Sequence, residues 1–168
     1  NLALARLAAV EDIRLDADGN LSVARDFLAG GKIDAQAGGS MDLGGPISSG
    51  GDMRLTSGVA MNVAGDLQSG GDFVARSVGD MRLGGAAARI AVAGDAQLDA
   101  RNLDLAGHTV VTGGMIAHAA GDASYSGQLV VGQDAVLDAA HHLSMHGETQ
   151  VNRDLGLHAG SVAIQADV

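Results

Sequence analysis

The chain has few of the residues on which most compact domains of its size rely. It has no Cys and no Trp, a single Pro, and only 2% aromatic residues among its 168 positions. The absence of Cys excludes a disulfide framework, and so few aromatic side chains exclude a core built on large rings. We therefore expect a thin core that is filled by Leu, Val, Ile, Met and Ala.

Positive charge and long apolar runs are also scarce. The formal net charge is −10, which argues against nucleic acid, heparin-like polyanions and anionic membranes as partners. No apolar run approaches the roughly 20 residues of a membrane-spanning helix, so no membrane insertion is predicted. The 26 Gly residues do not indicate disorder, because 46% of the chain is hydrophobic and the two kinds of residue are interleaved periodically.

Short apolar strands recur along the chain with a period of about twenty residues. The unit from Asp52 to Asp72 contains three short runs of alternating apolar and polar residues, separated by Gly or Ser. The alternation predicts strands and the breaks predict turns. We define the anchor of each unit as the residue before its first strand, which gives Asp12, Lys32, Asp52, Asp72, Asp95, Met115, Asp134 and Asp154. Their separations are 20, 20, 20, 23, 20, 19 and 20 residues.

This pattern predicts an all-β solenoid of about eight coils with three short strands per coil, because one such coil cannot bury its apolar face alone. Stacked parallel strands lie about 4.8 Å apart, so the solenoid should be roughly 40 Å long. The register predicts an outward column of Arg14, Asp34 and Arg54, and it places Ile116 and His118 inward. Since residues 1–168 start and end inside a repeat, we expect one β-helix segment excised from a longer array.

One corner of the predicted solenoid is longer than the others. The interval of 23 residues places three extra residues between the second and third strands of its coil, where a turn accepts them at small cost. This enlarged corner alone interrupts the surface, and we predict that it is a binding surface. It consists of Gly84, Gly85, Ala86, Ala87, Ala88 and Arg89.

Two sets of polar residues raise the question of a metal site. The repeated anchor Asp residues suggest a calcium ladder, but the nine-residue calcium-binding repeat is absent, and we expect each Asp to accept backbone N–H groups of its own turn. The candidates for a second metal or pH-sensing site are His141, His142, His146 and His158. These histidines should point to different faces and stay solvated. We expect the inward His118 to bond to a turn carbonyl in the core.

Catalysis is the most distant alternative. Polysaccharide-degrading β-helix enzymes place clustered Asp, Arg or Lys in a cleft formed by long loops, whereas the loops predicted here are minimal. No Ser–His–Asp spacing or phosphate-binding loop is present. We predict no catalytic residue, no cofactor and no bound metal.

Two short motifs recur at the strands. The motif G-D-x-x-L stands at Gly51 to Leu55 and at Gly94 to Leu98, and x-L-x-L-x-G stands at Asn102 to Gly107. Coils of about twenty residues with these motifs resemble the haemagglutinin repeats of the filamentous haemagglutinin family. The resemblance covers the whole chain and implies a right-handed parallel β-helix.

The resemblance also implies a function. Members of this family are large bacterial exoproteins that leave the cell by two-partner secretion, with an outer-membrane transporter as partner. A secreted or cell-surface location, a role in virulence, and adhesion to host cells through a glycan or protein receptor are therefore expected. Contact-dependent toxin-delivery proteins share such repeats, so a toxin-delivery stalk is the alternative.

Overall fold

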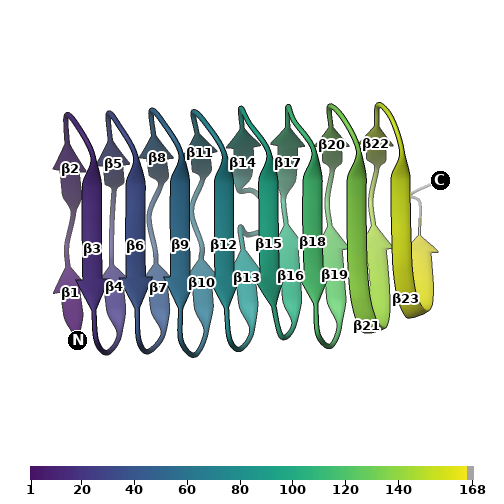
Figure 1. Cartoon of the computed structure of the whole chain (residues 1–168), viewed down its shortest axis with the longest axis horizontal. Helices are drawn as coiled ribbons and strands as arrows, with labels where there is room; N and C mark the ends of the chain where they lie inside the picture. Colours follow the sequence, from purple (N-terminus) through teal and green to yellow (C-terminus); the bar gives the residue numbers. More distant parts are fainter. Residues whose placement is uncertain (166–168) are drawn as a thin grey trace.

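The computed structural model describes residues 1–165 as one elongated stack of about eight coils (Figure 1). All strand pairs are parallel, and each strand pairs with its counterparts in the coils before and after it. The described residues form strands and turns without any helix, so none is long and apolar enough to cross a membrane. The predicted parallel β-helix is therefore confirmed.

Each coil contributes a first, a second and a third strand. The first strands are β3 (Ile13–Ala17), β6 (Ile33–Ala37), β9 (Met53–Ser57), β12 (Phe73–Ser77), β15 (Ala96–Ala100) and β18 (Met115–Ala119). The second strands are β1 (Leu2–Leu4), β4 (Leu21–Val23), β7 (Met41–Leu43), β10 (Met61–Val63), β13 (Met81–Leu83), β16 (Leu103–Ala106) and β19 (Ala123–Ser126).

The third strands form a separate sheet of eight strands on another side of the stack. They are β2 (Leu7–Ala9), β5 (Phe27–Ala29), β8 (Ile47–Ser49), β11 (Leu67–Ser69), β14 (Arg89–Val92), β17 (His108–Val111), β20 (Leu129–Val131) and β22 (Thr149–Val151). In the last two coils the first and second strands run together as β21 (Ala135–His146) and β23 (Leu155–Gln165), so all first and second strands belong to one sheet of 15 strands.

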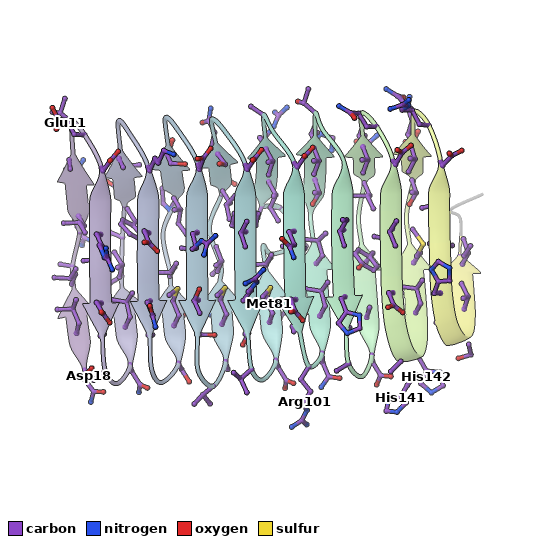
Figure 2. All side chains as sticks on the ribbon, viewed as in Figure 1. Glu11, Asp18, Met81, Arg101, His141 and His142 are labelled. Carbon is purple, nitrogen blue, oxygen red and sulfur yellow. The ribbon has the colours of Figure 1, made fainter. Side chains whose placement is uncertain are left out.

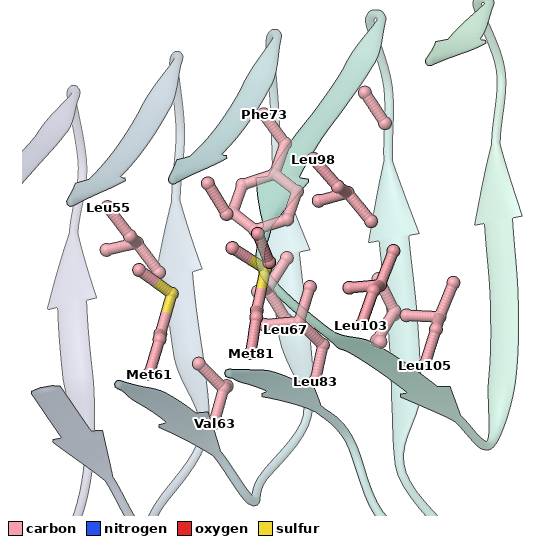
Figure 3. Close-up of a cluster of buried hydrophobic side chains, with 14 of the residues drawn as sticks. Leu55, Met61, Val63, Leu67, Phe73, Met81, Leu83, Leu98, Leu103 and Leu105 are labelled. Carbon is pink, nitrogen blue, oxygen red and sulfur yellow. The ribbon is translucent and has the colours of Figure 1, made fainter. Parts of the chain in front are cut away.

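The core is a narrow column of aliphatic and Met side chains between these sheets (Figure 3). In the second strands, Met61, Met81 and Leu103 stack in register and are at most 2% exposed. Phe73 fills the same column from a first strand and is 1% exposed. Inward Ser side chains form hydrogen bonds within a coil or between coils: Ser49 Oγ donates to the carbonyl oxygen of Gly51 at 2.8 Å, and Ser57 Oγ donates to Ser77 Oγ at 3.0 Å. The thin aliphatic core follows from the lack of aromatic residues.

The predicted register is wrong in one first strand. Met115 belongs to β18 and is 1% exposed, whereas Ile116 is 56% exposed and His118 points to solvent. Leu103, the first residue of β16, comes three positions after Ala100, the last residue of β15. In the preceding coils the second strand begins four positions after the first strand ends. The coil that begins at Ala96 therefore ends one residue early, and a slip of one residue exchanges the inner and outer faces of a strand. The next coil begins at Met115, so its anchor is Gly114.

The corrected register makes a prediction about the stability of the fold. Leu103→Asp should place an unpaired carboxylate in the core and lower the free energy of unfolding by about 3 kcal/mol or more. Asp104→Ser, one residue further along β16, should change it by less than about 1 kcal/mol, because Asp104 is only half-buried and its ion pair with Arg82 is weak. Urea denaturation of both variants provides the comparison. Equal destabilisation would contradict the register of the second strands.

Candidate functional site

The anchor residues stack in a column at the corner that precedes each first strand. Where the anchor is Asp, its Oδ1 atom accepts the backbone N–H of the anchor in the next coil. These hydrogen bonds join Lys32 N to Asp12, Asp72 N to Asp52, Asp95 N to Asp72, Gly114 N to Asp95 and Asp154 N to Asp134, at 2.7–3.2 Å. The prediction that each Asp bonds within its own turn is wrong. The carboxylates link successive coils.

A second column of the same kind precedes the second strands, and sequence reasoning missed it. Its members are Asn or Asp residues whose side-chain oxygen accepts the N–H of the residue one coil later. The bonds join Asn20 N to Asn1, Ser40 N to Asn20, Asp122 N to Asn102 and His142 N to Asp122, at 2.9–3.2 Å. One signal in the sequence could have revealed this column. An Asn or Asp recurs about twenty residues before a pair that consists of a Gly and the residue that donates the N–H.

Glycine at these corners makes room for the carboxylate or amide of the coil beneath. A Cβ atom at Gly71 would overlap Oδ1 of Asp52. The same overlap with an Asp or Asn oxygen arises at Gly31, Gly39, Gly94, Gly113 and Gly121. At the equivalent corner above Gly114 the residue is Gln133. Because Gly114 has no side chain, nothing there would overlap a Cβ, and glycine is not needed. The Gly-Asp motif is thus a contact between two coils.

Glycine is the best fit at these positions and not an absolute requirement. Arg153 and His141 stand at the equivalent places above Asp134 and Asp122. The corresponding hydrogen bonds are still present, at 3.1 and 3.2 Å. The bond from Asp72 N to Asp52, beside Gly71, is equally long at 3.2 Å, so a side chain at this place does not prevent the contact.

Lys32 replaces Asp in the anchor column and forms an ion pair. Its Nζ atom lies 2.7 Å from Oδ2 of Asp52. The hydrogen bond from Lys32, followed by the N–H of Asp72, lowers the pKa of Asp52 below its ordinary value of 3.8. The bond to Asp52 in turn raises the pKa of Lys32 above its ordinary value of 10.5. Both side chains are solvent-exposed, so the pair contributes little stability by itself.

The outward faces of the strands carry columns of polar side chains, as predicted. Arg14, Asp34 and Arg54 are in register on the first strands. On the second strands, Asn62 donates to Oδ1 of Asp42 at 2.8 Å, and Arg82 Nε lies 3.4 Å from Oδ2 of Asp104. These contacts join neighbouring coils across the outer surface.

The candidate histidines do not converge. The side chains of His141, His142, His146 and His158 are exposed, and the ring of His142 contacts the hydroxyl of Ser161. His141 and His142 lie on the corner between the first and second strands (Figure 2). His118, which we predict to be a core residue, instead lies outside, with Nδ1 3.0 Å from Oδ2 of Asp138. Within residues 1–165, no three His, Asp or Glu side chains are placed to bind one metal ion.

The enlarged corner lies between β13 and β14, as predicted. Gly84 adopts a φ of +76°, Ala88 N donates to the carbonyl oxygen of Gly85 at 2.9 Å, and Arg89 N donates to Oδ1 of Asp66 at 2.8 Å. Gly84 and Ala88 are buried, while Ala86 and Ala87 are exposed. The corner is therefore a compact, hydrogen-bonded turn with a small exposed tip.

The enlarged corner lies between two groups of coils whose turns after the second strand differ in backbone conformation. Among residues 1–165, positive φ values occur only at Gly84, Gly107, Gly127 and Gly147, which all begin or follow this corner. Glycine adopts this conformation without steric cost. The earlier coils turn at the same place through residues 24–26, 44–46 and 64–66 without positive φ. The extra residues absorb the change from one turn geometry to the other.

Stacked parallel coils with short corners define this protein as a β-helix of the shaft type. A family model for the haemagglutinin repeat matches residues 1–80 and again residues 82–168. The chain therefore belongs to the haemagglutinin repeat family, which is an adhesin repeat family and not an enzyme family. No curated protein and no solved structure matches the chain. The resemblance to the filamentous haemagglutinin family is thus confirmed.

The contact between Gly71 and Asp52 is testable by substitution. Gly71→Ala should lower the free energy of unfolding by about 1–3 kcal/mol, because the new methyl group overlaps the carboxylate beneath it. Gly51→Ala is the matched control: the one tight approach of its Cβ would be to the flexible Cγ of Lys32, at 3.2 Å, and its other neighbours lie at 3.6 Å or more. Thermal melts should show little change for the control. In the double variant Gly71→Ala with Asp52→Ala, part of the lost stability should return, and strict additivity would contradict the contact.

The ion pair of Lys32 and Asp52 predicts a plateau of stability between two pH limits. The folded pKa of Asp52 is lowered, so its contribution is present above 3.8 and is lost as the pH falls through the folded value. The folded pKa of Lys32 is raised, so its contribution is present below 10.5 and is lost as the pH rises through the folded value. Melting temperatures of Asp52→Asn and the wild type should differ at pH 7 and converge in strong acid. A difference that persists in strong acid would contradict this linkage.

Proposed function

We infer that this segment acts as part of the shaft of a secreted bacterial surface adhesin and contributes to attachment to host cells. The observation that carries this proposal is the family match over both halves of a stack of near-uniform coils. Each coil presents the same short corners and polar outer columns, so the surface repeats about every 4.8 Å along the axis. Such a surface offers many equivalent weak contacts to a host glycan or a protein receptor.

The same family match supports a proposal for the location and the route of export. A secreted or cell-surface position fits the haemagglutinin repeat, and an outer-membrane transporter is the expected partner of the full-length protein. Catalysis is not part of the proposal. The anchor carboxylates are occupied in bonds between coils, as in the 2.8 Å bond from Gly114 N to Asp95.

We also assign the enlarged corner a local role in binding. Ala86 and Ala87 at its tip are exposed, and Arg89 adds an exposed positive charge. Hydrogen bonds to Asp66 and Gly85 restrain the backbone next to the tip, and such restraint lowers the entropic cost of binding.

Adhesion assays test the proposal. Beads that carry many copies of the chain should adhere to host cells, whereas monomer in solution should compete poorly, since linked weak sites gain about 10²- to 10⁴-fold in avidity. Moderate salt should have little effect, because the net charge of −10 does not favour electrostatic capture. Tight binding of the monomer to heparin, or turnover of a polysaccharide, would contradict the shaft function.

Two variants address the enlarged corner. Deletion of Ala86 to Ala88 restores the separation of Leu83 and Ile90 to that of Val63 and Leu67 in the preceding coil, so the fold should survive. Substitution of Ala86 and Ala87 by Glu keeps the backbone and changes only the tip. Reduced bead adhesion in both variants supports a binding role, and unchanged adhesion in both removes the corner from the proposal.

A further inference from the structure

A shallow groove runs along the axis of the stack on the outer face of the second strands. It crosses β7, β10, β13, β16, β19 and the second half of β21, and its volume is about 880 Å³. Its length over six coils is about 24 Å at 4.8 Å per coil. His142, labelled in Figure 2, lies at its C-terminal end. We call this feature the axial groove. Its shape fits a linear polymer better than a compact ligand.

Two columns of polar residues form the walls of the axial groove. One is the outward column of the second strands, with Asp42, Asn62, Arg82 and Asp104 at its centre. The other consists of the residues just before the second strands, with Asp80 and Asn102 opposite that centre. The floor is strand backbone. The groove therefore offers hydrogen-bonding side chains along both edges.

These wall residues are already oriented by bonds to one another. Asn62 donates to Asp42 at 2.8 Å, Asn102 donates to Oδ1 of Asp80 at 2.8 Å, and Arg82 Nε lies 3.4 Å from Asp104. A carboxylate has about four acceptor sites and a guanidinium has five donors, so each group keeps capacity for a ligand. Side chains held in this way lose less entropy on binding.

The charge of the axial groove selects against anionic polymers. Four Asp residues and one Arg line it, which leaves a net negative charge. Sulfated or acidic glycans would be repelled, whereas Asp and Asn side chains are suited to the hydroxyl groups of uncharged sugars. The groove has no Phe, Tyr or Trp side chain for stacking, so affinity must come mainly from hydrogen bonds repeated along its length.

The sheet beneath the axial groove also disfavours a polypeptide ligand. An extended peptide usually binds a sheet by pairing with a free edge strand. The strands β7, β10, β13, β16 and β19 are each paired on both sides, so they present no free edge to the groove.

We propose that the axial groove binds a linear, uncharged polysaccharide, with Asn62, Arg82 and Asp104 as its central contacts. This proposal rests on the adhesive function inferred above and names the class of ligand and its place. The proposed binding of glycan chains by the axial groove is independent of any role of the enlarged corner.

The test is a titration of the isotopically labelled chain with cellohexaose and with the hexamer of N-acetylglucosamine, followed by NMR amide shifts. At least one of these neutral hexamers should shift amides along the axial groove and leave residues 84–89 unchanged. A heparin-derived hexasaccharide and an uncharged Gly-Ser peptide should produce no such shifts. Failure of both neutral hexamers to shift the groove, or stronger shifts with heparin, would overturn the proposal.

Matched double variants sharpen the test. Asn62→Ala with Arg82→Ala should weaken hexamer binding about tenfold or more, since hydrogen bonds to charged groups are lost. Gln36→Ala with Arg54→Ala removes an exposed amide and guanidinium from the first strands, away from the groove, and should leave binding unchanged. Equal effects of the two double variants would overturn the assignment.

The same variants separate this inference from the adhesive function. If beads of the Asn62→Ala, Arg82→Ala variant still adhere fully to host cells, adhesion stands and the groove is not its glycan site. If the hexamers bind the groove but wild-type beads do not adhere, the groove assignment stands and the adhesive function fails.

Discussion

Stacking in register at about 4.8 Å is the constraint on which the whole structure depends. No coil has a core of its own, so Leu103 is buried only because Met81 and Ala123 lie directly before and after it. The same spacing places every corner beside its own copy. Repeated carboxylates would repel one another there, but each Asp instead accepts an N–H from the next coil, as Asp72 does from Asp95 at 2.9 Å. The corner charge thereby stabilises the stack.

The sequence predicts most of this architecture because its two periods are strong. Apolar alternation along each strand fixed the inward pairs of the second strands, and the twenty-residue repeat fixed which strands are neighbours. The error at Met115 has a local cause. Met115 and Ile116 are both apolar, so alternation alone did not decide between them. The interval of 19 residues shows that one residue is missing, but not that the corner after Ala100 is the shortened one. Partners across coils were also hidden, because neither Asp52 nor Gly71 shows by itself that they meet.

The candidate functional surfaces were less predictable for the same reason. The enlarged corner was visible as an interruption of the repeat, and the structure shows it as a change of turn geometry that ends in positive φ at Gly107, Gly127 and Gly147. The axial groove was not visible, since it is formed by columns whose members lie about twenty residues apart and vary in type. In a repeat fold, a binding surface extends over several coils. Its chemistry is therefore set by residues that stack one coil apart.

Hydrogen exchange at the corner amides tests the central claim most directly. If anchor carboxylates join successive coils, the amides of Lys32, Asp72, Asp95 and Gly114 should exchange slowly although they lie at exposed corners. The amides of Asp52 and Asp134 are the internal comparison, because Lys32 and Gly114 beneath them have no side-chain oxygen, and they should exchange faster. Equally fast exchange at all six amides would contradict the account.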